Sequence, residues 1–170
     1  MSYEAETVAN AFLLTADNHG YRINAMKLQK LLYLVQGGSL SLLDRAMISD
    51  DCLCGDYGPI FKSVFHELRR WGIDLIKEWI VDDSDPDRFD PRRHIDEQDW
   101  AMIRAVWRKA GRYDACYLSE IAANKEGPWD QTRQKFSLFS PKIIPKSLLR
   151  DYFLDLLKPD STDQTNKETP

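Results

Sequence analysis

Cysteine is scarce in this sequence of 170 residues, and long hydrophobic runs are absent. The three cysteines are Cys52, Cys54 and Cys116, an odd number that does not suggest the disulfide framework of a small exported protein. No run approaches the 18 or so consecutive apolar residues that indicate a membrane-spanning helix. The first six residues include two acids and no basic residue, so we expect no secretory signal. These absences predict a cytoplasmic protein with free thiols and no membrane partner.

Positive charge is not in excess either. The chain has 23 Lys and Arg against 27 Asp and Glu, which gives a net charge of −4 at pH 7. Domains dedicated to nucleic acid usually carry a basic excess, so the composition argues against that class without excluding a local basic patch. Two stretches, Arg69-Arg70-Trp71 and residues 88–93, mix cations with aromatics. Solvated helix ends and loops are the simpler interpretation, because acids surround the second stretch.

Signatures of catalysis and of phosphate binding are also missing. The sequence has no Walker loop, no GxGxxG and no nucleophile elbow. Cys52 and Cys54 form the most tempting metal site, but alternate residues of a strand point to opposite faces, and no second Cys/His pair has zinc-finger spacing. The acidic run 82–90 lacks the Gly and Glu of an EF-hand. We therefore expect structural thiols, a solvated loop, no metal, no cofactor and no enzymatic activity.

Helical spacing of apolar residues is present along most of the chain. From Ala5 to Ala16, apolar residues recur at i, i+3, i+4 and i+7, which is typical of an amphipathic helix. Asn24, Asp96 and Asp114 have side chains that cap helix N-termini. Comparable patterns predict further helices over about 25–43, 59–71, 97–110, 114–124 and 146–157, with another helical turn after Gly127.

Glycine and proline add detail to two of these helices. Gly37-Gly38 interrupts the helix over 25–43, and indicates either a close crossing with another helix or a helix end. Pro59 is expected in the first turn of the helix over 59–71, where its missing N–H would have been unpaired anyway. That helix would turn inward Phe61, Val64, Phe65 and Leu68.

Helical periodicity is lost in two segments. Residues 46–58 fit a short strand through Ile48, Cys52 and Cys54, and residues 73–81 fit either a short helix or a strand. We therefore predict a mainly α fold: a single compact domain of about six to eight helices, with a small β-hairpin or short strands near 46–56 and 73–81. Residues 1–158 would form this domain and residues 159–170 a disordered polar tail.

Polar residues accompany the apolar stripe of the helix over 25–43. Lys27 and Lys30 are three residues apart and Tyr33 continues the row, so all three share one side. Lys27, Gln29 and Lys30 lie off the stripe of leucines. The spacing predicts a small cationic and aromatic strip on the helix surface, and an ordinary solvent face is the simplest interpretation of it.

Several blocks of the sequence, in their order and spacing, resemble the Panacea domain, a family that includes SocA-like antitoxins and phage-associated proteins. The blocks are Lys27–Tyr33, Tyr57–Ile60, Leu118-Ser119, Gly127–Trp129 and Tyr152-Phe153, within residues 5–155. The resemblance singles out positions that either contact a partner or hold the fold: Lys27, Gln29, Lys30, Tyr33, Tyr57, Gly58, Pro59, Pro128 and Trp129. The chain departs from the family pattern at Gly55, Ala122 and Ala123, where the family often has Trp, Thr and His.

The resemblance implies a function as well as a fold. It implies a helical antitoxin that binds and neutralises a cognate protein toxin encoded by a neighbouring gene. One branch of the family implies an adaptor that delivers the toxin to an ATP-dependent protease. The net charge of −4 suits a basic toxin through electrostatic steering. A nucleic-acid-binding operon repressor is the alternative, and a metal-dependent hydrolase is a less favoured one.

Overall fold

A computed structural model describes residues 1–135 and 142–158 of the chain. Within these residues the protein is mainly α, as predicted, with eight α-helices, one 3-10 turn at Arg69–Trp71 and one two-stranded sheet. The helices are α1 (Ala5–Asn18), α2 (Ala25–Leu42), α3 (Lys62–Leu68), α4 (Pro91–His94), α5 (Glu97–Ala110), α6 (Ala115–Ala122), α7 (Pro128–Lys135) and α8 (Lys146–Leu157). The predicted tail, residues 159–170, lies outside the described residues.

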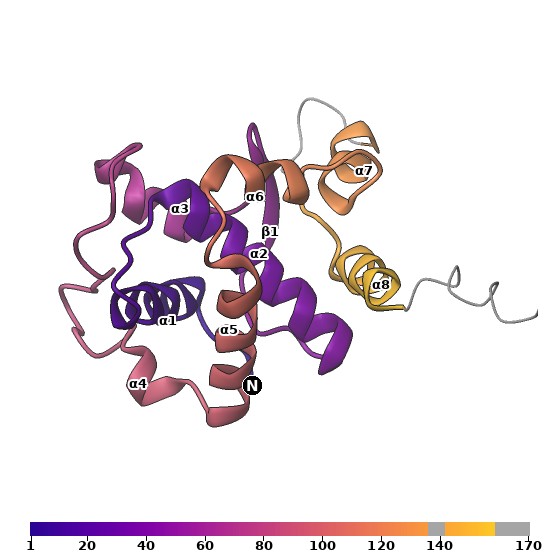
Figure 1. Ribbon diagram of the computed structural model, residues 1–170. Helices are drawn as coiled ribbons and strands as arrows, with labels where there is room; N and C mark the ends of the chain where they lie inside the picture. Colours follow the sequence, from indigo (N-terminus) through magenta and orange to yellow (C-terminus); the bar gives the residue numbers. More distant parts are fainter. Residues whose placement is uncertain (136–141, 159–170) are drawn as a thin grey trace, which may run out of the picture.

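Helix α2 runs through the centre of the molecule, with α1 on one side and α8 on the other (Figure 1). Helices α5 and α6 and the two-stranded sheet also pack against it. Its predicted apolar stripe is completely buried, and burial of each such side chain stabilises the fold by about 2 kcal/mol. The stripe consists of Leu28, Leu31, Leu32 and Val35.

Helix starts follow the predicted side-chain caps. The Asn24 carboxamide oxygen accepts a hydrogen bond from the backbone N–H of Lys27 at 2.9 Å. Asp96 caps α5 and Asp114 caps α6 in the same way, at 2.9 and 2.8 Å. Each cap satisfies an N–H that the helix itself leaves unpaired, so a short stretch of sequence is enough to place it.

Gly37 marks a close helix crossing, which decides between the two alternatives for the Gly37-Gly38 pair. Helix α2 continues through both glycines to Leu42, and α8 crosses it at Gly37. A Cβ on Gly37 would lie 2.3 Å from the Phe153 ring, a distance that no packed side chain can keep. Glycine therefore allows the Phe153 ring to rest directly on the α2 backbone.

A β-hairpin forms at residues 52–61. Strand β1 (Cys52–Gly55) pairs antiparallel with β2 (Gly58–Phe61), and Asp56-Tyr57 forms the turn between them. The predicted position of Pro59 in a helix is therefore wrong: Pro59 lies in β2 opposite Cys54, and α3 begins at Lys62. Strand β1 also pairs with Ile143 on its other side, whereas β2 has β1 as its one strand partner in the described residues, so a proline without an N–H is tolerated in β2.

A buried amide replaces the secondary structure expected for residues 73–81. The described chain has no helix or strand there, although Ile76 and Ile80 are buried. The Asn10 carboxamide accepts from the N–H of Ile80 at 2.9 Å and donates to the carbonyls of Ile80 and Phe89 at 2.8 and 3.0 Å. The segment has one short backbone pairing, an antiparallel bridge between Leu75 and Asn24 in which the Ile76 N–H donates to the Ile23 carbonyl at 2.9 Å, and a side chain of α1 satisfies the backbone at Ile80. The acidic run that follows is largely exposed, as expected, and leads into α4.

Candidate functional site

Gln29 and Lys30 of α2 are buried beneath the hairpin. Lys30 belongs to the predicted surface strip, so the prediction of a strip on the helix surface is wrong. The Gln29 carboxamide donates to the Phe61 carbonyl at 3.1 Å and accepts from the Phe61 N–H at 2.8 Å. Lys30 is only 2 % exposed, and its Nζ donates to the Pro59 carbonyl at 3.1 Å. The spacing of residues along α2 could not show that β2 covers this face.

The Lys30 side chain lies directly against Gly58. Burial lowers the pKa of Lys30 from its usual 10.5 to about 8. Gly58 has a φ of +112°, and a Cβ at this position would lie 2.8 Å from the Lys30 Nζ. Glycine is therefore favoured both by the backbone conformation and by the space that the ammonium group occupies.

Lys27 and Tyr33 lie in separate surroundings, although they share the row with Lys30. Lys27 is half-buried; its Nζ donates to the Gly111 carbonyl and lies 5.5 Å from the centroid of the Trp107 ring. Tyr33 is buried, and its ring meets the Phe153 ring edge-on at a centroid distance of 5.5 Å. The row thus connects α2 to the end of α5 and to α8, and forms no continuous surface.

Trp129 of α7 binds the hairpin at the end of its other strand, β1. The Trp129 Nε1 donates to the Gly55 carbonyl at 2.9 Å, and both Pro128 and Trp129 are buried. The Arg133 guanidinium lies 4.9 Å from the centroid of the Trp129 ring. A Cβ on Gly55 would lie 2.9 Å from the Gly58 carbonyl oxygen, so this hairpin has no room for the Trp that the family often has at that position.

The hairpin, the first half of α2 and α3 border a hollow of about 440 Å³, which we call the hairpin hollow. Tyr57 at the turn is 79 % exposed and Phe65 of α3 is 46 % exposed, although the sequence predicted that Phe65 packs inward. Isolated exposed apolar residues are ordinary, but a group of them around a concavity makes this hollow a candidate binding surface. The residues that define the hollow are Met26, Lys30, Asp56, Tyr57, Ile60 and Phe65.

The thiols do not gather with other potential ligands. Burial raises the pKa of both Cys52 and Cys54, which keeps the thiols protonated. Cys116 is exposed on α6, away from the other two in sequence. In the described part of the chain, no group of three or more His, Cys, Asp and Glu residues could hold a metal ion.

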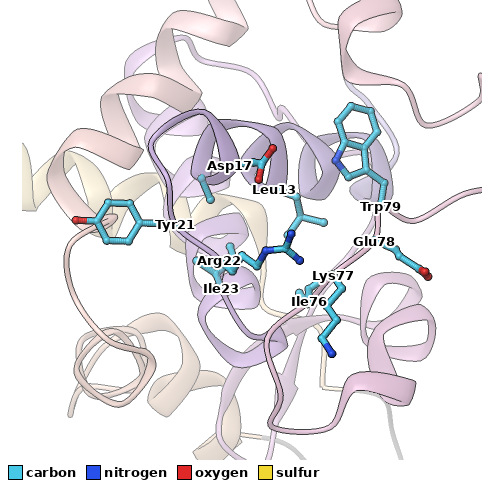
Figure 2. A pocket seen from close by; sticks show the side chains of 10 residues that line it. Leu13, Asp17, Tyr21, Arg22, Ile23, Ile76, Lys77, Glu78 and Trp79 are labelled. Carbon is cyan, nitrogen blue, oxygen red and sulfur yellow. The ribbon is translucent and has the colours of Figure 1, made fainter.

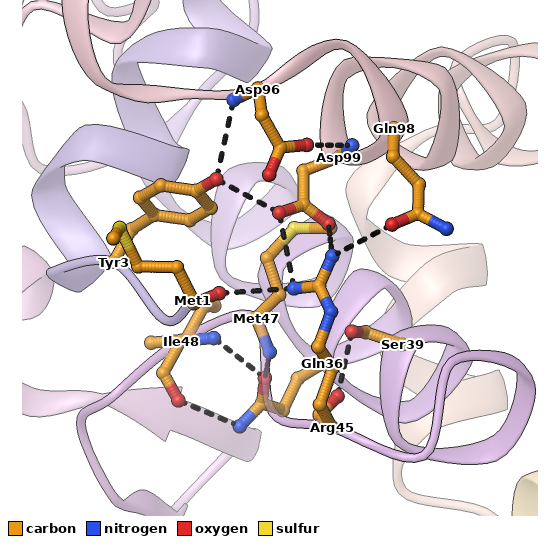
Figure 3. A network of polar contacts seen from close by, with 10 residues as sticks. All are labelled: Met1, Tyr3, Gln36, Ser39, Arg45, Met47, Ile48, Asp96, Gln98 and Asp99. Carbon is orange, nitrogen blue, oxygen red and sulfur yellow. Dashed lines mark hydrogen bonds and ion pairs between the residues drawn. The ribbon is translucent and has the colours of Figure 1, made fainter.

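A buried polar network that the sequence did not reveal surrounds Asp99, the third residue of α5 (Figure 3). The Arg45 guanidinium donates to both carboxylate oxygens of Asp99, at 2.7 and 3.1 Å, and the Tyr3 hydroxyl donates at 2.9 Å. Burial and the neighbouring carboxylates raise the pKa of Tyr3 to about 12. Tyr3 and Asp99 are 96 positions apart, so no sequence pattern links them.

A smaller hollow of about 140 Å³ lies between the end of α1 and residues 76–79 (Figure 2). Its charged side chains are Asp17, Arg22, Lys77 and Glu78. Two acids and two cations leave it without net charge, so it favours no ion of either sign.

The fold and the hairpin define a mainly α domain in which Gln29, Lys30 and Trp129 bind the backbone of the hairpin. A family model described as "Antitoxin SocA-like, Panacea domain" matches residues 28–130, which is more than half of the chain. The chain belongs to this family, and its membership supports an antitoxin role in general. A search of curated proteins found no match, and neither did a search of solved structures. No helix in the described ranges is long and apolar enough to cross a membrane.

Proposed function

We propose that this chain neutralises a cognate protein toxin by binding it directly, with the hairpin hollow at the centre of the interface. The observation that carries the proposal is the exposure of Tyr57 and Phe65 beside a concave surface. Aromatic residues that enter or border pockets dominate the energy of protein interfaces. Inhibition needs no chemistry in the antitoxin, because covering the working surface of the toxin is sufficient.

The support of the hairpin favours this position for the interface. Gln29 and Lys30 bind β2 from below, and Trp129 binds the end of β1. A turn held in this way loses little conformational freedom when a partner binds, which lowers the cost of association. The buried family positions then have a role: they hold the hairpin so that Tyr57 has a fixed orientation.

The chemistry of the partner is a finer part of the proposal. The net charge of −4 supports a basic toxin, because opposite charges speed the encounter of two proteins. Asp56 beside Tyr57 places one of these acids at the hairpin hollow. Delivery of the toxin to an ATP-dependent protease stays a prediction from the family resemblance.

Co-expression with the product of the neighbouring gene tests the proposal. Wild-type protein should relieve the growth arrest caused by that product and should bind it in a pull-down. Tyr57→Ser and Phe65→Ser should each weaken binding about 30-fold, which corresponds to the roughly 2 kcal/mol of an interface hot spot. Tyr117→Ser, which alters an exposed tyrosine of α6, is the matched control and should bind like the wild type.

Two results would overturn the proposal. If the neighbouring product arrests growth and wild-type protein neither binds nor relieves it, direct neutralisation is wrong. If Tyr57→Ser and Phe65→Ser bind as tightly as Tyr117→Ser, the hairpin hollow is not the interface.

A further inference from the structure

A second surface lies at the C-terminal end of α5 and has the opposite charge to the whole chain. From Arg104 to Tyr113 the sequence has four cations and no acid, in a protein of net charge −4. Arg108, Lys109 and Arg112 are exposed, and none of them forms an ion pair within the described residues. Arg104 pairs with Glu97, and both of these side chains are largely exposed, so solvent screens their interaction.

Aromatic rings lie near the C-terminal end of α5; Tyr21 and Tyr117 are exposed, whereas Trp107 is buried. On one side Tyr21, which is 56 % exposed, meets the Trp107 ring edge-on at 6.2 Å, and the His19 ring lies 5.9 Å from Trp107. On the other side the rings of Tyr113 and Tyr117 lie 4.6 Å apart. The tertiary structure alone brings the end of α1 next to α5 and so completes this arrangement.

A hollow of about 300 Å³ between α1 and α5 continues the surface. The Trp100 ring, the Arg104 guanidinium with its partner Glu97, and the polar side chains of Asn18 and His19 line it. It therefore offers an aromatic face, a guanidinium that is shared with Glu97, and hydrogen-bonding groups together. We call the whole arrangement the α5-end surface; it comprises His19, Tyr21, Arg104, Arg108, Lys109, Arg112, Tyr113 and Tyr117.

We propose that the α5-end surface binds single-stranded nucleic acid. Lys and Arg neutralise phosphates, and aromatic rings stack on bases that are free of a duplex. The Arg112 guanidinium already lies 4.9 Å from the Tyr113 ring centroid, an arrangement that a base can extend. In a duplex the base faces are covered, so the exposed rings would find no partner there.

Of the acids near the surface, Glu120 is exposed on α6 three residues after Tyr117, and the others are already engaged or face elsewhere. Glu97 is paired with Arg104, and the Asp114 carboxylate caps α6 by accepting from the Tyr117 N–H. Asp17 lies at the end of α1, where it lines the smaller hollow on the side of Arg22 (Figure 2). Arg108, Lys109 and Arg112 therefore remain available to phosphates.

Fluorescence anisotropy with the full chain and a labelled 12-nucleotide oligothymidine tests the proposal. Three phosphate contacts predict that the logarithm of the association constant falls with the logarithm of salt concentration at a slope of about −2. Arg108→Glu should weaken binding at least 10-fold and make this slope shallower. Tyr21→Leu should weaken binding by about 5-fold or more through lost stacking and leave the slope unchanged.

Arg70→Glu is the matched control, because it makes the same change of net charge at an exposed arginine of the 3-10 turn. It should bind the oligonucleotide like the wild type, within about twofold. The proposal is overturned by no binding at 50 mM salt, by an equal loss in Arg70→Glu, or by tighter binding of the matching duplex. Competition by polyglutamate at equal charge concentration would also overturn it, and would assign the surface to an acidic protein partner.

Discussion

The Lys30 ammonium group is buried in the protein interior, where it donates a hydrogen bond to one carbonyl, that of Pro59. The depressed pKa of about 8 means that burial of the charged form costs roughly 3 kcal/mol near neutral pH. An apolar side chain would avoid this cost, but it could not bind the carbonyl of a proline strand. We infer that the ammonium group favours one position of the hairpin over others, and that burial of its charge lowers the free energy of unfolding.

Replacement of Lys30 by Met should show this cost as a pH dependence. In the wild type the unfolded state keeps its Lys30 proton up to about pH 10.5, whereas the folded state loses it near pH 8. The unfolded state therefore binds more protons in this window, so the Lys30 contribution to stability rises with pH. From pH 7 to pH 10, the unfolding free energy of the wild type relative to Lys30→Met should increase by about 2 kcal/mol.

Urea denaturation at both pH values measures this difference. Lys62→Met, at an exposed lysine of α3, is the control and should show no such trend relative to the wild type. If the difference in unfolding free energy between the wild type and Lys30→Met stays constant from pH 7 to pH 10, burial of the charged ammonium group does not lower the stability.

Burial also decides how much the ion pair between Arg45 and Asp99 contributes to stability. The Asp99 carboxylate is completely buried, and among residues 1–135 and 142–158 Arg45 is the one cation that pairs with it. Arg45→Met should destabilise the protein by about 3 kcal/mol, because it leaves a buried carboxylate without its partner. Arg45→Lys keeps the charge and loses only the paired geometry, so it should cost about 1 kcal/mol. Equal losses in the two variants, measured by thermal unfolding, would contradict this explanation.

At the scale of elements, α2 is a platform whose polar side chains bind non-helical backbone. Gln29 and Lys30 hold β2, and the Gln36 carboxamide accepts from the N–H groups of Met47 and Ile48 at 3.0 and 2.8 Å (Figure 3). A central helix can therefore support loops and a hairpin that have few backbone partners of their own. The same helix supplies the apolar stripe of the core.

Alanine substitutions at Gly37 and Gly38 test the close crossing of α2 and α8, with Gly38 as the control. Gly37→Ala should destabilise the protein by about 1–3 kcal/mol, since the new methyl group meets the Phe153 ring. Gly38→Ala should instead be neutral or stabilise by up to about 1 kcal/mol, because its Cβ would lie 3.4 Å from the Met102 sulfur and alanine favours the helix. Chemical denaturation measures both; a Gly37→Ala variant as stable as Gly38→Ala would contradict the close crossing.

On the scale of the whole molecule, the two proposed surfaces differ in chemistry and in the elements that build them. The hairpin hollow combines Tyr57 and Phe65 from the hairpin and α3, whereas the α5-end surface uses cations of α5. We expect their functions to separate. Tyr57→Ser should lose toxin binding and keep oligonucleotide binding, while Arg108→Glu should do the reverse.

Both substitutions are at exposed positions, so the free energy of unfolding of each variant should lie within about 0.5 kcal/mol of that of the wild type. Pull-down and anisotropy on the same preparations check the separation. If one substitution abolishes both activities without loss of stability, the two surfaces act as one site, and the proposal of separate partners fails.

Sequence alone determined the features that depend on a few neighbouring residues. The apolar stripes of α1, α2 and α5 and the caps at Asn24, Asp96 and Asp114 were all predicted. A helix repeats every 3.6 residues, and a cap reaches only two or three residues ahead, so both leave a local pattern. The order of the motif blocks also sufficed to indicate the family.

Tertiary structure decided whatever depends on which element covers which face. Lys30 faces inward because β2 lies over it, Pro59 is in a strand because Cys54 pairs with it, and Phe65 is exposed because nothing in the described residues covers it. Asp99 meets Tyr3 across 96 positions. Such contacts come from folding together distant parts of the chain, and neither periodicity nor spacing along one helix records them.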